Sequence, residues 1–361
     1  MTEPGHRMFA DALARCAATE PALPADRSGD LIDLADRLRA PLTVAVRGRP
    51  GVGRRTVARA LTCAGVTTVD RGAELVVRVL AEVPKPEDLA ALAGPGRPGL
   101  LILNKADLTG FRPGGPVAAA ARYCVRLAAS TGVPAEPMVA LAAVAADGLA
   151  DGPEDPDGGA LAALRVLVTA PADLSSPDAF LAGAHPLSAR VRAGLLERLD
   201  LFGIAHAVVA LRADPAAGGA EVCAALRRAG RIEPVIAALA RAGATPMYRR
   251  VAAATARLRE LACGDPDAED AVAGFLAGDD AVAARAAAAA AVLASAGLTV
   301  ESGAADPEGP GRPEPGLRAA LRWRRYRDGP LDALHRDCAG DLVRAALRPA
   351  PAGPTRCGPT R

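Results

Sequence analysis

The pattern of hydrophobic and polar positions divides the chain into two parts. In the first part, short apolar runs typical of buried strands alternate with amphipathic stretches typical of helices. The expected strands are 42–46, 66–69, 74–80, 100–103 and 137–141, with helices after the first strand and at 84–94 and 117–130. Such alternation predicts an α/β domain in which helices flank a mostly parallel sheet.

The strand signal almost disappears after 151–159, where DGPEDPDGG has the composition of a linker. Helices are expected at 160–168, 187–202, 217–229, 231–242, 246–262, 268–296, 316–327 and 331–347. The similar phrases VCAALRRAG and VIAALARAG predict a helical hairpin. The predicted division is a helical lead-in (1–34), the α/β domain (35–150), an all-α domain (151–348) with a disordered loop near 301–316, and a disordered tail (349–361).

Composition narrows the possible functions. Aromatic residues make up 2% of the chain, so its core must be built from Ala, Leu and Val. Seven scattered cysteines without a C-x-x-C pair indicate free thiols rather than disulfides or zinc. The net charge of +2 excludes a strong pull towards nucleic acid or anionic membrane. With no evident signal peptide or membrane-spanning segment, we expect a cytoplasmic protein.

The stretch 42–56, LTVAVRGRPGVGRRT, combines an expected strand, a glycine-rich loop and the start of a helix. Gly48 and Gly53 have the G-x-x-x-x-G spacing of a P-loop, and Gly51 lies between them. In such a loop, glycines let backbone N–H groups converge on phosphate oxygens, and the helix dipole adds positive potential. The stretch therefore predicts a phosphate cradle.

The residues after this loop depart from the P-loop pattern. Lys and then Ser or Thr should follow, but Arg54 and Arg55 stand there, and Arg and Lys are not interchangeable at such a site. Thr56 comes one residue late, about 100° further around the helix, away from a metal. No D-x-x-G motif follows; Asp70 is either a Walker-B-type aspartate or a turn residue. Hydrolysis needs a metal ion and a positioned water, and the sequence shows residues for neither.

A second motif follows the expected strand 100–103, where the chain reads LLILNKAD. The carboxylate of Asp107 can accept bonds from both donors of a guanine edge, which adenine lacks. Asn104 can bond the opposite base edge or tie its turn back to the P-loop, and the stem of Lys105 can lie along the base. The alternative is an ordinary turn at a strand end, where these residue types are common.

Together, GRPGVGRRT and LNKAD resemble the first motif and the base-specificity motif of P-loop GTPases, and among them of bacterial dynamin-like proteins. The likeness covers about 40–262, where phrases such as LLERLDLFGIAHAVVAL are similar to stalk-forming helices. It implies a head that binds GTP or GDP on a helical bundle. Val139-Ala140 stands where a further base-contacting loop of that family falls, but without the usual Ser-Ala.

We therefore expect a guanine-nucleotide-binding protein with a degenerate P-loop, shortened switch regions and little or no hydrolysis. Its helical domain would serve self-association or partner binding. The expected site comprises Gly48, Gly51, Gly53, Arg54, Arg55, Thr56, Asn104, Lys105 and Asp107, with no catalytic residue, no metal ligand and no assigned Mg²⁺. A scaffold that keeps the fold but binds no nucleotide is the alternative; an ATP-dependent kinase is disfavoured, because the N-K-A-D motif has no role there.

The expected nucleotide site does not include the basic and aromatic segment Arg322–Arg327. Such segments occur on surfaces that bind nucleic acid or anionic lipid. The favoured interpretation is a helix end, with its Trp and Tyr docked in a core and its arginines paired with carboxylates or solvent. Peripheral membrane contact is left open, although no amphipathic membrane insert is visible.

Overall fold

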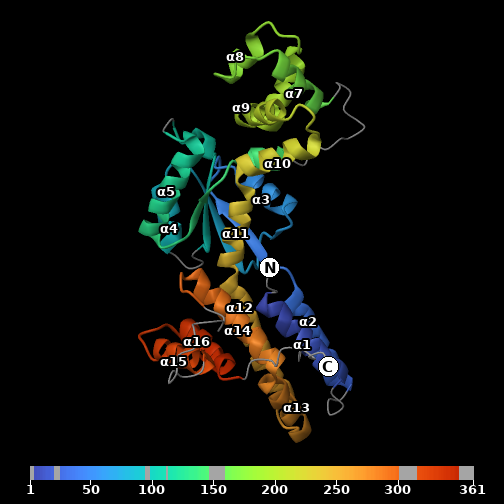
Figure 1. Cartoon of the computed structure of the whole chain (residues 1–361), viewed down its shortest axis with the longest axis vertical. Helices are drawn as coiled ribbons and strands as arrows, with labels where there is room; N and C mark the ends of the chain where they lie inside the picture. Colours follow the sequence, from blue (N-terminus) through green and yellow to red (C-terminus); the bar gives the residue numbers. More distant parts are fainter. Residues whose placement is uncertain are drawn as a thin grey trace, which may run out of the picture. The chain divides into compact units, whose positions relative to one another are not determined.

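The computed structural model of the chain describes residues 4–19, 25–93, 98–110, 113–145, 159–300 and 315–348 (Figure 1). The chain forms two compact units. Unit 1 comprises Met1–Ala40 and Gly243–Arg361, and unit 2 comprises Pro41–Ala242, so the sequence of unit 2 is inserted into that of unit 1. This division differs from the predicted boundaries near 34 and 150, because the helices between 160 and 242 pack with the elements of the α/β domain, and residues 1–40 pack with helices after 243.

Unit 2 contains a five-stranded sheet in the order β2-β1-β3-β4-β5, and every neighbouring pair of its strands is parallel. The strands are β1 (Thr43–Gly48), β2 (Thr67–Thr68), β3 (Leu75–Ala81), β4 (Leu100–Asn104) and β5 (Ala135–Pro137). The interior strand β4 is buried along its whole length, which explains its continuous apolar run. The parallel sheet with flanking helices confirms the expected α/β architecture.

The last strand is shorter than predicted. The apolar run 137–141 was expected to be a strand, but β5 ends at Pro137 and α6 (Ala140–Ala145) follows after two residues. The N–H of Val139 donates to the carbonyl of Gly230 at 3.1 Å, outside the sheet. The run is buried by helical contacts and not by strand pairing, so apolar character alone misassigned it.

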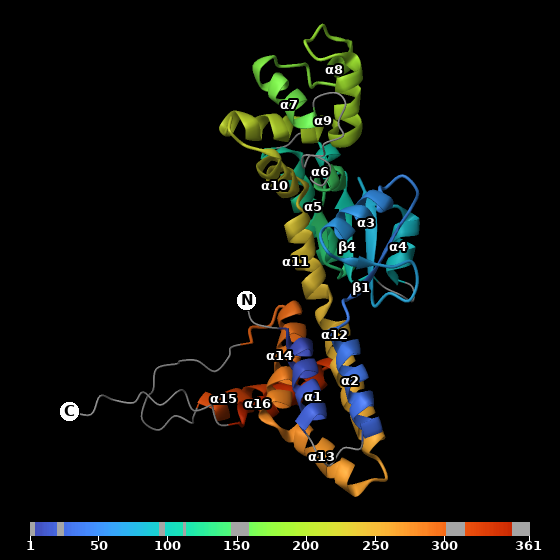
Figure 2. The ribbon, with the colours of Figure 1, turned by 90° about the vertical axis from the view of Figure 1, so that its right-hand side faces the viewer.

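Helices cover both faces of the sheet (Figure 2). On one face, α3 (Arg54–Cys63), α6 and α11 (Ile232–Ala242) share a core with apolar side chains of β1, β3 and β4. On the other face, α5 (Gly115–Thr131) packs against β4, and Leu92 of α4 (Pro86–Ala93) joins the same core. A segment that was assigned to the helical domain, α11, therefore completes the α/β layer.

Four further helices belong to unit 2: α7 (Ala160–Thr169), α8 (Pro177–Ala182), α9 (Ala189–Ala213) and α10 (Gly219–Gly230). Their common core includes Leu164, Phe180 and Leu195. The chain turns sharply between α10 and α11 at Arg231, which has a φ of 62°. The predicted hairpin of these two helices is wrong, because α10 packs mainly on α6 and α9 whereas α11 packs on the sheet.

Unit 1 is helical throughout its described residues. It contains α1 (Gly5–Thr19), α2 (Ala25–Arg39), α12 (Ala244–Ala262), α13 (Pro266–Ala277), α14 (Asp279–Ser295), α15 (Pro315–Arg327) and α16 (Ala333–Ala346). One core joins Phe9 and Leu13 of α1 to Leu258 and Leu293 from the later helices. Gly278 separates α13 from α14, where a single helix was predicted. Residues 151–158 of the predicted linker 151–159, residues 301–314 of the predicted loop 301–316 and the predicted tail 349–361 lie outside the described residues.

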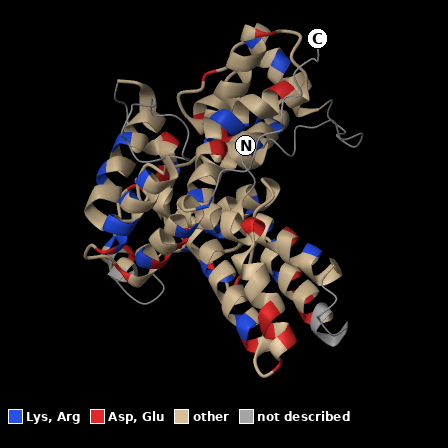
Figure 3. Ribbon diagram, turned by 60° about the horizontal axis from the view of Figure 1, so that its bottom comes forward, with Lys and Arg blue, Asp and Glu red and all other residues tan. Residues whose placement is uncertain are grey.

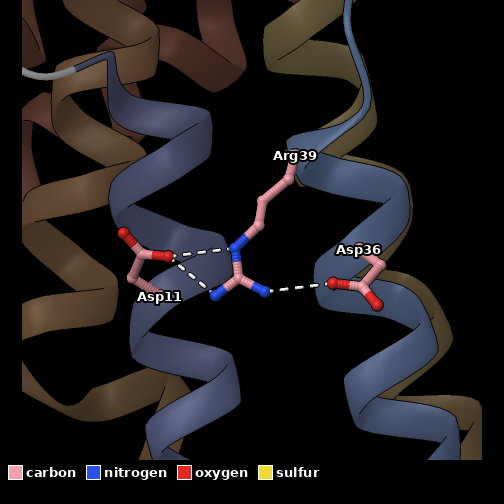
Figure 4. Close-up of polar contacts among 3 residues, drawn as sticks. All are labelled: Asp11, Asp36 and Arg39. Carbon is pink, nitrogen blue, oxygen red and sulfur yellow. Dashed lines mark hydrogen bonds and ion pairs between the residues drawn. The ribbon is translucent and has the colours of Figure 1, made fainter.

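Polar contacts on the surface of unit 1 also connect α1 to α2. The guanidinium of Arg39 donates to one oxygen of Asp11 at 2.7 and 3.1 Å and to Asp36 at 3.1 Å (Figure 4). The bonds to Asp11 are the main reason why the pKa of Arg39 rises above its ordinary value. Over the whole chain, basic and acidic residues are interspersed, in keeping with the small net charge (Figure 3).

The basic and aromatic segment lies at the end of α15. Trp323 is 5% exposed and belongs to the unit 1 core, and the Tyr326 hydroxyl lies 3.2 Å from Nδ1 of His335. The Arg322 guanidinium covers the indole ring at 4.9 Å. This is the docked helix end that the sequence analysis favoured. No described helix of the chain is both long and apolar enough to cross a membrane.

Candidate functional site

The two motifs of the expected nucleotide site lie at one edge of the sheet. The glycine-rich loop follows β1, and the turn with Lys105 and Asp107 follows β4; β3 separates the two strands. Since the strands are parallel, their carboxyl ends meet at the same edge, which is where open α/β sheets bind ligands. The topology therefore brings both motifs to the same end of unit 2.

Asn104 connects the two motifs directly. Its side chain is 4% exposed, and its Nδ2 donates to the carbonyl of Val52 in the glycine-rich loop at 2.9 Å. Its Oδ1 accepts from the N–H of Ala140 at 3.1 Å. The loops after β1, β4 and β5 are thus joined through one buried amide. Of the two roles expected for Asn104, this geometry is the tie to the P-loop.

Gly53 is where Asn104 approaches the loop most closely. A Cβ on Gly53 would lie 2.3 Å from Nδ2 of Asn104, and the glycine has a φ of 82°. Both observations exclude a larger residue without distortion. Gly48 is constrained by packing instead, since a Cβ there would lie 2.8 Å from the carbonyl oxygen of Val79. Two of the three predicted glycines therefore have a structural reason, and Gly51, with a φ of 85°, has a conformational one.

The loop leads into the N-terminus of α3. The first bond within this helix runs from the N–H of Val57 to the carbonyl of Gly53 at 3.0 Å. The N–H groups of Arg54, Arg55 and Thr56 precede it and so have no acceptor within the helix. These N–H groups lie at the positive end of the helix dipole, which favours a bound anion. The local backbone is compatible with a bound phosphate, and the phosphate cradle stays a prediction.

The two arginines of the loop differ in what they contact. The side chains of Arg54 and Arg55 are both exposed. The Arg54 guanidinium bends back towards the loop, where it donates to the carbonyl of Gly48 in a long bond of 3.4 Å. Its positive charge therefore lies beside the cradle, while its bulk covers part of the loop backbone. Thr56 is half-buried in the first turn of α3.

A buried carboxylate that the sequence analysis did not single out anchors the same loop. Asp88 in α4 is fully buried, and its Oδ2 accepts from Nε of Arg49 at 2.9 Å and from the N–H of Lys85 at 3.1 Å. Arg78 of β3 lies 3.6 Å from its other oxygen. Arg49 is therefore a structural anchor of the loop. An acidic residue in a first helical turn is so common that sequence gave no signal for this role.

Asp107 lies in the short 3-10 turn Ala106–Leu108 and is half-buried, whereas Lys105 is exposed and enters the turn with a φ of 57°. Burial raises the pKa of the Asp107 carboxyl above its ordinary value, and the negative charge of Asp200 raises it further; Lys105 acts in the opposite direction. The pKa of Asp107 is thus set partly by a residue of α9, almost 100 residues further along the sequence, which sequence reasoning missed.

The approach of α9 to this turn depends on a kink. Asp200 has a φ of 57° and a ψ of 173°, a region that is almost confined to glycine, and its Oδ1 accepts from the N–H of Leu201 at 2.7 Å. After the kink, Phe202 packs against the core that contains Ala106, and its ring lies 4.3 Å from that of His206. Burial lowers the pKa of His206.

No family model, curated protein or solved structure matches this chain. The interpretation of the site therefore depends on its residues and their geometry.

The candidate metal and switch residues do not form a centre. Asp70 is exposed and follows β2, next to β1, and its backbone carbonyl accepts from Arg47. Thr68, in β2 just before Asp70, is one of two threonines (with Thr67) that could stand for the switch threonine of a GTPase, and its hydroxyl bonds to that of Thr62 at 3.0 Å. Among the residues that the structure describes, no group of three or more His, Cys, Asp and Glu side chains is arranged to hold a metal ion.

Proposed function

We propose that unit 2 binds a guanine nucleotide, GTP or GDP, and hydrolyses it slowly or not at all. The glycine-rich loop and the N-terminus of α3 would surround the phosphates, and Asp107 would accept from the base. The observation that carries the proposal is the 2.9 Å bond from Asn104 to Val52, since it ties the phosphate loop to the base-recognition turn. A phosphate cradle and a guanine-selective carboxylate then belong to one site.

The wider resemblance is part of the same proposal. The parallel sheet, the loop after β1 and the N-K-A-D turn after β4 support a P-loop GTPase-type head similar to those of bacterial dynamin-like proteins. Arg55 in place of the Mg²⁺ ligand and the exposed, isolated Asp70 support slow chemistry. The helices of unit 1 would then serve self-association or a protein partner in the cytoplasm.

A scaffold without bound nucleotide is the second candidate function. Arg54 contacts Gly48 within the loop, and Arg49 is held by Asp88, so part of the loop is satisfied by its own side chains. A phosphate must displace Arg54 or recruit it. The charge of Asp200 beside Asp107 also disfavours the ionised carboxylate that guanine requires.

Titration of the full chain with fluorescent GDP, GTP and ATP analogues, with and without Mg²⁺, distinguishes the two functions. We expect saturable binding of the guanine nucleotides alone. Saturation by neither base at millimolar concentration would establish the scaffold, and binding of ATP as tight as GTP would exclude base recognition by Asp107. GTP turnover at an ordinary GTPase rate would refute the proposed loss of hydrolysis.

The substitution Asp107→Asn sharpens this test. The asparagine presents an N–H where the carboxylate presented an acceptor, and xanthine carries a carbonyl oxygen where guanine carries its exocyclic amine. We therefore expect the variant to lose GDP and to gain xanthosine diphosphate, each by at least about tenfold. Asp178→Asn in α8 is the control and should bind GDP like the unmodified chain. Equal loss of both nucleotides would instead indicate a folding defect.

A further inference from the structure

Unit 1 contains a cavity that the proposed nucleotide site does not use. It has a volume of about 750 Å³, and its lining residues come from α12, α13, α14 and α16 and from the residues that directly follow α12 and α16. Small-molecule sites typically occupy about 300–1,000 Å³. All lining residues belong to unit 1, so the cavity is a property of that unit alone.

One part of the lining is apolar. Val272 and Val282 are 6% and 7% exposed and belong to the walls contributed by α13 and α14. Leu276 adds a half-buried side chain from α13, and Leu347, which follows α16, is 61% exposed. An exposed leucine beside a cavity loses water contact when an apolar ligand enters, which favours binding.

The other part of the lining is basic. Four arginines line the cavity against two carboxylates; they are Arg259, Arg285, Arg344 and Arg348, with Glu269 and Asp341. Asp341 is 3% exposed and accepts from both Arg285, at 2.8 Å, and Arg344, at 2.6 Å, and also from the Tyr248 hydroxyl at 2.8 Å. One carboxylate is therefore shared by two arginines.

The remaining arginines determine the sign of the charge that the ligand should carry. Arg348 contacts Asp279 and the carbonyl of Ala277. Arg259 is exposed on α12, and none of the described carboxylates forms an ion pair with it. Even with Asp279 counted, arginines outnumber carboxylates around the cavity. The site therefore matches an anion, and its apolar walls match a hydrocarbon.

We propose that this cavity binds a small amphipathic anion, namely one alkyl chain with a carboxylate or phosphate head group. The chain lies along Val272, Leu276 and Val282, and the head group pairs with Arg259 at the rim. A neutral amphiphile fills the same walls but leaves the excess positive charge unpaired. The proposal is independent of nucleotide binding, because it concerns unit 1 alone.

Displacement of a dansyl-labelled undecanoate from the full chain tests the proposal. We expect dodecanoate or dodecyl phosphate to displace the probe, and the tighter of the two identifies the head group. Within a series from octanoate to dodecanoate, affinity should rise about fourfold for each added CH₂. Dodecanol should compete at least about tenfold more weakly than the anions. No saturable binding, or equal competition by dodecanol, would overturn the proposal.

Two substitutions at exposed positions locate the site. Arg259→Gln should weaken dodecanoate by about tenfold, and Ala273→Trp should abolish binding because the ring occupies the cavity. The matched control is Arg257→Gln, on the same helix but about 200° away from Arg259 and paired with Glu260 at 3.1 Å. Circular dichroism checks the fold of each variant. Unchanged affinity in both cavity variants would contradict the proposed site.

Discussion

Asn104 is the only asparagine of the chain, which has no glutamine, and its amide is the polar group on which the candidate site depends most. Its Nδ2 donates to the carbonyl of Val52, and its Oδ1 accepts from the N–H of Ala140. The chain has no other carboxamide side chain that could make these two bonds. Sequence reasoning could predict that Asn104 lies at a strand end. It could not decide between the base and the loop as the partner, because that choice depends on a distance.

Replacing Asn104 with Ala should therefore destabilise unit 2. The carbonyl of Val52 and the N–H of Ala140 both lose buried partners, at a cost of about 1–3 kcal/mol for each group. We expect the free energy of unfolding to fall by about 2–6 kcal/mol in urea titrations, together with a loss of guanine affinity. Asn104→Asp keeps an acceptor for Ala140 but turns a second oxygen, in place of the N–H donor, towards the carbonyl of Val52, so it should lose at least as much stability. A fully stable Asn104→Ala variant would show that the amide does not hold the loops.

The second residue-level prediction concerns pH. Guanine recognition needs an ionised Asp107, whose pKa is raised by burial. GDP binding should thus weaken on acidification at a pH above the ordinary aspartate value of about 4. For stability the sign is opposite: the neutral carboxyl is favoured in the folded state, so the contribution of Asp107 grows as pH falls through its folded pKa and is complete below the unfolded pKa.

GDP titrations across a pH series measure the first effect, with the fluorescence of the free nucleotide as control. A binding curve that does not change down to pH 4 would show that Asp107 does not read the base. Urea titrations at the same pH values measure the second effect. In Asp107→Asn, the part of the pH dependence that comes from this carboxyl should disappear from both measurements.

In unit 2, the local conformation of α9 affects the pKa of a residue that is distant in the sequence. Its kink at Asp200 costs about 1–3 kcal/mol in backbone strain and places a carboxylate near Asp107. Asp200→Gly should relieve the strain but lose the bond to Leu201, for a net gain of about 1 kcal/mol in unfolding free energy. Asp200→Asn keeps an acceptor and removes only the charge.

Both variants should lower the pKa of Asp107, because both remove the same negative charge. NMR titration of the Asp107 carboxyl measures the pKa, and thermal melting measures stability. A stability gain in Asp200→Gly alone, with the pKa lowered in both variants, is the expected result. If the pKa of Asp107 is unchanged in both, then Asp200 does not act on it.

The elements also show what sequence could predict. Apolar runs placed β1, β3 and β4 correctly, and the run is continuous only in β4, because that strand is buried along its whole length. The same criterion misplaced 137–141, since α6 is equally buried. The amphipathic pattern of α11 correctly predicted a helix but not its partner, because an apolar stripe fits a sheet as well as another helix. The break at Gly278 was not predicted, because an isolated glycine can lie within a helix or end one.

At the level of the whole chain, unit 2 is continuous in sequence and unit 1 is not. The three core clusters of unit 2 contain only residues between 41 and 242, so we expect a 41–242 fragment to fold on its own. Circular dichroism and cooperative urea unfolding would check this, and retained GDP binding would place the nucleotide site in unit 2. A fragment that is unfolded while the full chain is folded would contradict the division.

The matching fragment 243–361 should not fold stably. Without residues 1–40 it lacks Phe9, Leu13, Leu31 and Leu38, all of which lie in the unit 1 core with at most 2% exposure. Adding a separate peptide of residues 1–40 should restore helicity and a cooperative transition. Equal stability with and without that peptide would show that the two chain ends are not one folding unit.

Unit 1 is made of two separate stretches of the sequence, and this has a consequence for biosynthesis. The first forty residues leave the ribosome early, yet their packing partners begin only at Gly243. At about 5–20 residues per second, the apolar sides of α1 and α2 wait roughly 10–40 s for these partners. During that interval they are a target for holdase chaperones and for premature dimerisation between nascent chains of one polysome.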